Sequence, residues 1–132
     1  MKKLLVVGAS LVSISFYGQT AKSSFQKGEG EYYSKKYQEA VTDFDKALET
    51  EPANKAAHYY KAMCESYLGD NKTAVEEFTL VIDADAKNAD ALINRGRCKQ
   101  KLGDKDGACE DWNKAKELGD VDARAQVRNF CH

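Results

Sequence analysis

The sequence has little proline, little histidine and no excess of charge of either sign. Pro52 is the only proline among 132 residues, which favours an all-α fold because proline is the strongest helix breaker. The chain carries 20 Lys and Arg against 21 Asp and Glu, a formal net charge of −1. A general nucleic-acid-binding protein usually has a strong basic excess, so we expect no nucleic acid among the partners. The length corresponds to a single domain.

Sequence motifs for catalysis or metal binding are also missing. There is no glycine-rich phosphate loop and no Gly-x-Ser-x-Gly nucleophile motif. The stretch from Asp83 begins like a calcium loop, but Asn88 and Asn94 stand where that loop needs Gly and Glu. His58 and Cys64 are six residues apart, about 240° around a helix axis, and so cannot form a nucleophile–base pair. We therefore predict that the protein is not an enzyme and has no metal site and no cofactor.

The N-terminus has the only long uncharged stretch of the chain. Two lysines precede residues 4–17, which are uncharged and mostly apolar. This length is typical of a secretory signal peptide and shorter than the roughly 20 residues of a membrane-spanning helix. We predict a signal peptide at residues 1–18, cleaved after Gly18 or Ala21; a buried helix and a retained anchor are the alternatives. The protein would then be exported, periplasmic or secreted, without stable membrane insertion after cleavage.

A spacing of 34 residues organises the rest of the chain. Three alanines are each followed four residues later by an aromatic residue, and a Gly or Ala stands twelve residues before each of them. The three sets are Gly28, Ala40 and Phe44; Ala62, Ala74 and Phe78; and Gly96, Ala108 and Trp112. A small residue and a ring at this spacing share one stripe of a helix, and the facing Gly or Ala lets a second helix approach closely. The pairs Gly69–Asp70 and Gly103–Asp104 would close the two later hairpins. Such hairpins bury their apolar faces only by stacking.

At these residues the chain resembles the tetratricopeptide repeat family, and its last unit also resembles Sel1-like repeats. The resemblance implies an α-solenoid of three hairpins at 21–54, 55–88 and 89–122, followed by a capping helix within 123–132. We expect seven helices, near 22–34, 37–50, 54–68, 71–84, 88–102, 105–118 and 121–130. The chain departs from the family at two positions of the first helices, where charged residues replace the usual leucine and aromatic residues: Lys27, Lys61 and Arg95, and Glu31, Glu65 and Lys99.

The resemblance further implies that a partner would bind in a concave groove formed by the first helix of each unit. The groove positions are Lys22, Phe25, Glu29, Tyr32, Tyr33, Ala56, Tyr59, Met63, Ser66, Tyr67, Asp90, Ile93, Arg97, Gln100 and Lys101. Aromatic and Met-rich concave surfaces favour protein or peptide ligands. Alternatively, several of these rings pack between neighbouring helices. An exposed patch of Tyr32, Tyr59, Met63 and Tyr67 would favour the groove as the site.

Some family members hold a C-terminal carboxylate in this groove with a set of Lys, Asn and Arg side chains. The residues at those positions here are Phe25, Glu29, Tyr60, Asp90 and Asn94. Because this set contains no cation and only Asn94 is of a required residue type, we predict that this carboxylate site is absent.

We expect the protein to be an exported adaptor that binds a protein or peptide segment in the groove. The alternative is a structural subunit of a cell-envelope assembly, which would use an outer face or an open end to join other proteins or a second copy of itself. A thiol-redox protein is a remote third possibility, disfavoured because the four cysteines form no Cys-x-x-Cys motif.

The cysteines also predict a disulfide. In stacked hairpins Cys98, Cys109 and Cys131 should fall in one layer at the C-terminal end, and an exported protein can oxidise them. We favour Cys109–Cys131, which would attach the capping helix, over Cys98–Cys109, and expect Cys64 to be free and buried. Three free thiols or a zinc site are the alternatives, although the ligand spacing is unlike that of common zinc sites.

Overall fold

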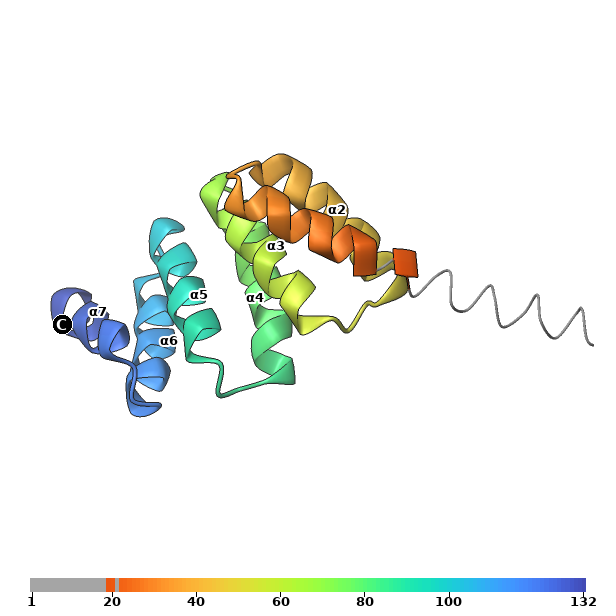
Figure 1. The fold of residues 1–132 in the computed structure, drawn as a ribbon. Coiled ribbons are helices and arrows are strands. Elements are labelled where there is room, and N and C mark those ends of the chain that lie inside the picture. Colours follow the sequence, from red (N-terminus) through yellow and green to blue (C-terminus); the bar gives the residue numbers. More distant parts are fainter. Residues whose placement is uncertain (1–18, 21) are drawn as a thin grey trace, which may run out of the picture.

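The computed structural model describes residues 19–20 and 22–132, and this part of the chain is helical without strands (Figure 1). The expected signal peptide, residues 1–18, lies outside the described residues. Residues 19–20 and 22–33 are helical and precede the labelled helices. The labelled helices are α2 (Tyr37–Thr50), α3 (Lys55–Tyr67), α4 (Asn71–Ala84), α5 (Ala89–Lys101), α6 (Lys105–Glu117) and α7 (Val121–Phe130). The predicted all-α fold and its seven helices are confirmed, with ends that differ by one or two residues.

Most helix starts and turns follow from local chemistry that the sequence repeats. An Asp or Asn side chain precedes five helices and accepts a hydrogen bond from the third backbone N–H of each, at Asn54, Asp70, Asn88, Asp104 and Asp120. Such N-caps satisfy backbone donors that the first turn leaves free. Gly69, Gly103 and Gly119 follow the helix ends with φ of 85° to 95°, a left-handed conformation that glycine adopts readily.

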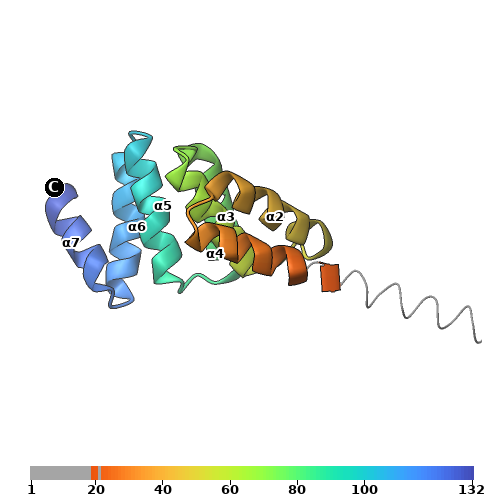
Figure 2. The ribbon, with the colours of Figure 1, turned by 45° about the horizontal axis from the view of Figure 1, so that its top comes forward.

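Consecutive helices pack against one another from α2 to α7, so the chain forms a short right-to-left array in Figures 1 and 2. The small and aromatic residues of the repeat are in its core, where Ala40, Ala74 and Ala108 and the rings of Phe44, Phe78 and Trp112 are at most 1% exposed. Among the described residues, no helix is both long enough and apolar enough to cross a membrane.

Close contact between paired helices depends on the small residues of the repeat. A Cβ atom at Gly28 would lie 2.8 Å from Cε1 of Phe44, and one at Gly96 would overlap the indole ring of Trp112. Trp112 is further fixed because its Nε1–H donates to the carbonyl oxygen of Ile93 at 3.2 Å. The aromatic residue of each outer unit therefore packs directly on the glycine of the facing helix.

Among the charged residues that depart from the family pattern, one cation of each unit pairs with an acidic residue of the second helix. Lys27 pairs with Asp43 at 2.9 Å and Lys61 with Glu77 at 3.0 Å. Arg95 makes two parallel hydrogen bonds to Asp111, at 2.7 and 2.8 Å. In each unit this pair joins the first helix to the second across the same 16 residues, so a polar contact links the two helices of every hairpin.

Candidate functional site

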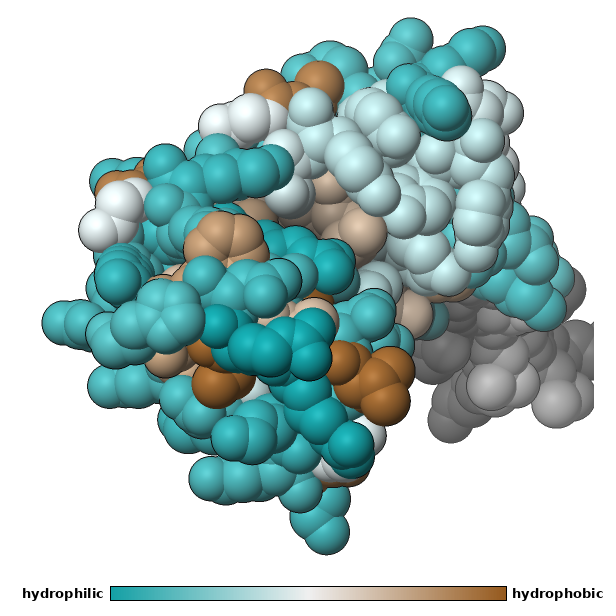
Figure 3. Space-filling view, turned by 90° about the vertical axis from the view of Figure 1, so that its left-hand side faces the viewer, coloured by the Kyte–Doolittle hydropathy of each residue, from teal (hydrophilic) through white to brown (hydrophobic). Residues whose placement is uncertain are grey.

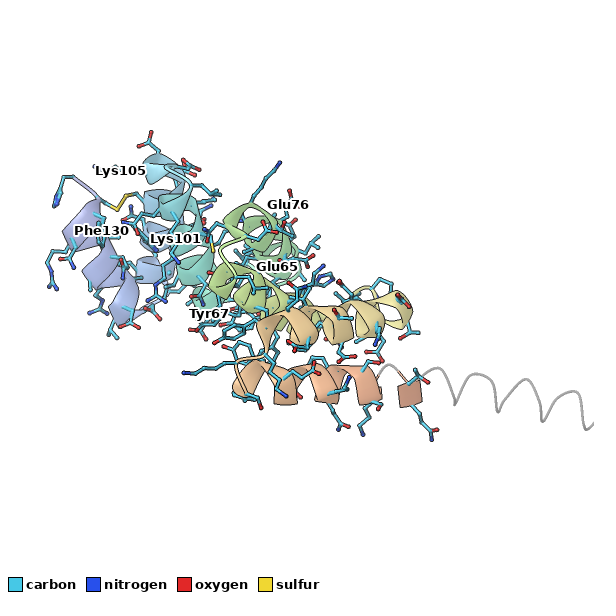
Figure 4. The ribbon with its side chains drawn as sticks, turned by 90° about the horizontal axis from the view of Figure 1, so that it is seen from above. Glu65, Tyr67, Glu76, Lys101, Lys105 and Phe130 are labelled. Carbon is cyan, nitrogen blue, oxygen red and sulfur yellow. A yellow bond between two sulfur atoms is a disulfide. The ribbon has the colours of Figure 1, made fainter. Side chains whose placement is uncertain are left out.

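A cleft of about 390 Å³ lies on the surface formed by α3, α5 and α7. We call it the α3–α5–α7 cleft. Its lining residues are Met63, Ser66 and Tyr67 of α3, Asn94, Arg97, Gln100 and Lys101 of α5, and Gln126 and Phe130 of α7. Figure 4 labels Tyr67, Lys101 and Phe130, which follow one another along the array from α3 to α7. The cleft is open to solvent, because Tyr67 is 57% and Phe130 41% exposed.

Tyrosines of the first two units continue this surface toward the N-terminal end of the array. Tyr67 stacks on Tyr37 with ring centroids 4.6 Å apart, and the hydroxyls of Tyr33 and Tyr60 are 3.2 Å apart. Tyr33 is 70% exposed. The hydrogen bond to Tyr33, together with burial, raises the pKa of Tyr60 to about 12, so this hydroxyl stays neutral at physiological pH. The result is a neutral aromatic surface beside the cleft.

The structure divides the predicted groove residues into three groups. Met63, Tyr67 and Arg97 line the cleft. Glu29 is half-buried and Tyr33 is exposed. Phe25, Tyr32 and Tyr59 are partly buried and pack between helices. Their ring centroids lie 5.8 Å from Phe44, 5.2 Å from Tyr60 and 5.8 Å from Phe78, respectively. Ile93 is only 4% exposed and packs in a cluster with Ala123 of α7. Tyr32, Tyr59, Met63 and Tyr67 therefore do not form one exposed patch, since only Tyr67 is largely accessible.

Two cleft residues were not considered in the sequence analysis, Gln126 and Phe130, and Asn94 was named there only at positions of sites predicted to be absent. The repeat places the caps Asn54 and Asn88 34 residues apart, but Asp120 follows Asn88 by only 32. The capping helix therefore begins two residues earlier than the period predicts. When the two helices are aligned at their N-caps, Gln126 of α7 corresponds to Asn94 of α5. The N-cap Asp120 is therefore the sequence signal that could have placed Gln126 and Phe130 on this surface.

Two cations give the cleft its electrostatic character. Arg97 and Lys101 are four residues apart on one face of α5, and no carboxylate lines the cleft. Arg97 Nη1 donates to Oδ1 of Asn94 at 3.1 Å, and Asn94 Nδ2 donates to the hydroxyl of Tyr59 at 3.3 Å. These hydrogen bonds hold the Arg97 guanidinium beside the cleft and leave its other N–H groups available.

A second polar cluster joins α3 to α4 and lies outside the cleft. His58 Nε2 donates to the carbonyl oxygen of Pro52 at 2.7 Å, and its Nδ1 lies 2.5 Å from Glu77. Burial acts to lower the pKa of Lys61, but the carboxylates of Asp45 and Glu77 outweigh it and raise that pKa. Burial raises the pKa of Glu65 to about 8, so at neutral pH this side chain is mostly an uncharged acid. The ion pairs of this cluster join the two helices of the second hairpin.

The four cysteines differ in environment. In the structure Cys109 of α6 and Cys131, directly after α7, are joined as a disulfide with Cα atoms 5.8 Å apart. Cys64 and Cys98 are free and buried. Burial raises the pKa of Cys64 to about 12 and also raises that of Cys98, so both are unreactive thiols at neutral pH. Over residues 19–20 and 22–132, no three His, Cys, Asp or Glu side chains are placed to hold a metal ion.

The space-filling view shows how limited the exposed hydrophobic surface is. The face in Figure 3 is mainly hydrophilic, with hydrophobic residues in small separate patches. Several exposed leucines stand singly at helix ends, at Leu68, Leu102 and Leu118. Scattered exposed leucines of this kind are normal in a soluble fold, so they do not define an interaction surface.

Comparison with known proteins agrees with this architecture. A family model described as a tetratricopeptide repeat matches residues 90–118. No curated protein sequence matches the chain. Among solved structures, the tetratricopeptide domain of Arabidopsis OM64 superposes with a TM-score of 0.80 at 22% identity, covering 86% of this chain and 96% of that one.

Two similar structures contain bound peptides. The first such domain of Spaghetti (RPAP3), bound to an HSP90 peptide, has a TM-score of 0.79 at 22% identity and covers 85% of this chain and 90% of its own. The second domain of human RPAP3, in complex with an HSP70 peptide, has a TM-score of 0.80 at 21% identity, with coverages of 88% and 98%. The chain therefore has the fold of these tetratricopeptide domains, and residues 90–118 match one tetratricopeptide repeat.

Proposed function

We propose that the protein is an adaptor that binds an extended segment of a partner protein in the α3–α5–α7 cleft. The observation that carries this proposal is the cleft itself, which is open and combines the exposed rings of Tyr67 and Phe130 with polar side chains between them. Aromatic residues beside adaptable hydrogen-bonding groups are typical of peptide-binding surfaces. The peptides bound by similar folds, from HSP90 and HSP70, support the same class of ligand.

Binding here requires no chemistry beyond presentation of a rigid surface. Ser66, Asn94, Gln100 and Gln126 offer hydroxyl and amide groups that donate and accept hydrogen bonds. An extended segment has unpaired backbone N–H and C=O groups that such side chains satisfy, while its apolar side chains contact the rings. The stacked helices fix these groups in advance, which reduces the entropy lost on binding.

Export is part of the same proposal. The lysines and the uncharged residues 4–17 of the N-terminus support a cleaved signal peptide. In an oxidising compartment the Cys109–Cys131 bridge would persist, and the partner would be a periplasmic or secreted protein.

Selection of peptides on the purified chain tests the adaptor function. We expect a library of random dodecapeptides displayed on phage to yield binders. Replacing Tyr67 with Ala should weaken their affinity at least tenfold, which is the loss of about 1.4 kcal/mol that truncating an interface anchor commonly causes.

The matched control is Leu80→Ala. Leu80 is 49% exposed, similar to Tyr67, but it lies on α4 outside the cleft, so we expect its replacement to leave the affinity unchanged. Failure to enrich any peptide, or equal losses in the two variants, would contradict the proposed function and favour a structural role for another face.

A further inference from the structure

We propose that the α3–α5–α7 cleft selects a partner segment that carries acidic side chains next to an aromatic one. This inference rests on the proposed function and adds the chemistry of the partner. It differs from capture of a chain end, because it assigns the recognition to side-chain carboxylates within the segment.

The charge of the cleft supports this choice. Four other basic residues of α3, α5 and the helix at 22–33 are neutralised in ion pairs: Lys27, Lys61, Arg95 and Lys99. Arg97 and Lys101 are both exposed, and within the described part of the chain neither forms an ion pair. The one acidic residue of α5, Asp90, is seven residues from Arg97, about 10 Å along the helix axis. The lining of the cleft therefore carries two positive charges and no carboxylate.

The apolar side chains define the second requirement. Met63 and Tyr67 stand on the α3 side of the cations, and Phe130 stands on the α7 side. Phe130 is held in place by Trp112, whose ring centroid is 5.8 Å away, and by the neighbouring Cys131 in the disulfide. An aromatic side chain of the partner would contact Tyr67 or Phe130 while acidic neighbours reach Arg97 and Lys101. Charge-assisted hydrogen bonds of this kind are roughly twice as strong as neutral ones.

A pair of synthetic peptides tests the inference directly. Both are fluorescein-labelled, acetylated and amidated octapeptides with a central Phe, and they differ only in having four Glu or four Gln residues around it. The amidated end removes the terminal carboxylate. In fluorescence polarisation at about 50 mM salt, where charges are weakly screened, we expect the Glu peptide to bind at least tenfold tighter. The difference should shrink at 300 mM salt.

Charge variants then locate the effect. Arg97→Gln combined with Lys101→Gln should abolish the preference for the Glu peptide. Lys72→Gln combined with Lys116→Gln removes the same charge from exposed positions outside the cleft and should retain it. Phe130→Ala should weaken both peptides and keep the ratio between them. Circular dichroism of each variant would verify that the helices are intact.

The outcomes separate this inference from the proposed function. Equal binding of the two peptides, no binding of either, or an equal loss of preference in both double variants overturns the acidic selection. The adaptor function survives each of these results if phage-selected peptides still bind and respond to Tyr67→Ala. If neither the octapeptides nor any phage-displayed peptide binds, both the acidic selection and the adaptor function are contradicted.

Discussion

At the scale of single residues, glycines determine how closely the hairpins pack. Gly96 is in direct contact with the indole of Trp112, a side chain that is 1% exposed and hydrogen-bonded to Ile93. Gly30 lies on the helix at 22–33 with nothing within 4 Å of where a Cβ atom would be. The same substitution should therefore have opposite effects at the two sites.

We predict that Gly96→Ala lowers the free energy of unfolding by roughly 1–3 kcal/mol, because the buried ring cannot move away from the added methyl group. Gly30→Ala should raise it by up to about 1 kcal/mol, because alanine loses less backbone entropy in a helix. Urea denaturation followed by circular dichroism measures both. Two variants of equal stability would show that the two helices are not packed as described.

Glu65 is a second residue whose environment has a measurable consequence. Its carboxyl group is 5% exposed and its Oε2 has no hydrogen-bond partner within the described residues. Burial raises its pKa to about 8, whereas an unfolded glutamate titrates near 4.3. Between about pH 4.3 and 8 the Glu65 carboxyl is protonated in the folded state and ionised in the unfolded state. Its contribution to the free energy of unfolding is therefore largest below about pH 4.3 and falls as the pH rises to 8.

We predict that Glu65→Gln removes most of this fall, because the amide stays neutral at every pH. The thermal midpoint of the variant should exceed that of the wild type by several degrees at pH 8.5, with a smaller difference at pH 5. Glu76→Gln, at an exposed position of α4, serves as the control and should follow the wild type. A constant difference between Glu65→Gln and the wild type across this range would mean that folding does not raise the pKa of Glu65.

Single-residue roles were only partly predictable from the sequence. The small and aromatic core residues could be predicted, because their 34-residue spacing places them on the same face of each helix. The charges at Lys27, Lys61 and Arg95 could be seen as departures from the family, but their partners could not. Pairing them with residues 16 positions later depends on how the second helix is rotated against the first, and a repeat pattern does not fix that rotation.

At the scale of elements, α7 is the least secured part of the array. It has ten residues, too few for a stable isolated helix, and Ala123 is its single fully buried residue. Beyond that contact, Phe130 packs on Trp112 and Cys131 is bonded to Cys109. The sequence predicted this capping helix at 121–130, where the structure has it, although its N-cap Asp120 lies two residues before the position that the 34-residue period gives.

We predict that Cys131→Ser lowers the free energy of unfolding by about 3 kcal/mol under oxidising conditions, as expected for a bridge that closes a loop of 22 residues. The amides of α7 should exchange with solvent faster, while those of α3 and α4 should change little. A reductant should reproduce the effect in the wild type and have none in the variant. Alkylation of all four thiols in the exported protein without reductant would show that the bridge does not form.

At the scale of the whole molecule, the surface along the array of helices has two distinct parts. The N-terminal part presents neutral tyrosines, of which Tyr33 and Tyr67 are exposed. The C-terminal part is the α3–α5–α7 cleft with Arg97 and Lys101. The general position of a groove followed from the family resemblance. Its restriction to the C-terminal part did not, because packing of Phe25, Tyr32 and Tyr59 between helices depends on the tertiary structure.

The central claim is that the α3–α5–α7 cleft is the surface on which a partner segment binds. Titration of the ¹⁵N-labelled chain with a phage-selected dodecapeptide, followed by backbone amide chemical shifts, tests it most directly. The account predicts that the shifted amides cluster at 63–67 of α3, 94–101 of α5 and 126–130 of α7, and that the outward faces of α4 and α6 are unaffected. Shifts centred on α4 or α6, or none at saturating peptide, would contradict it.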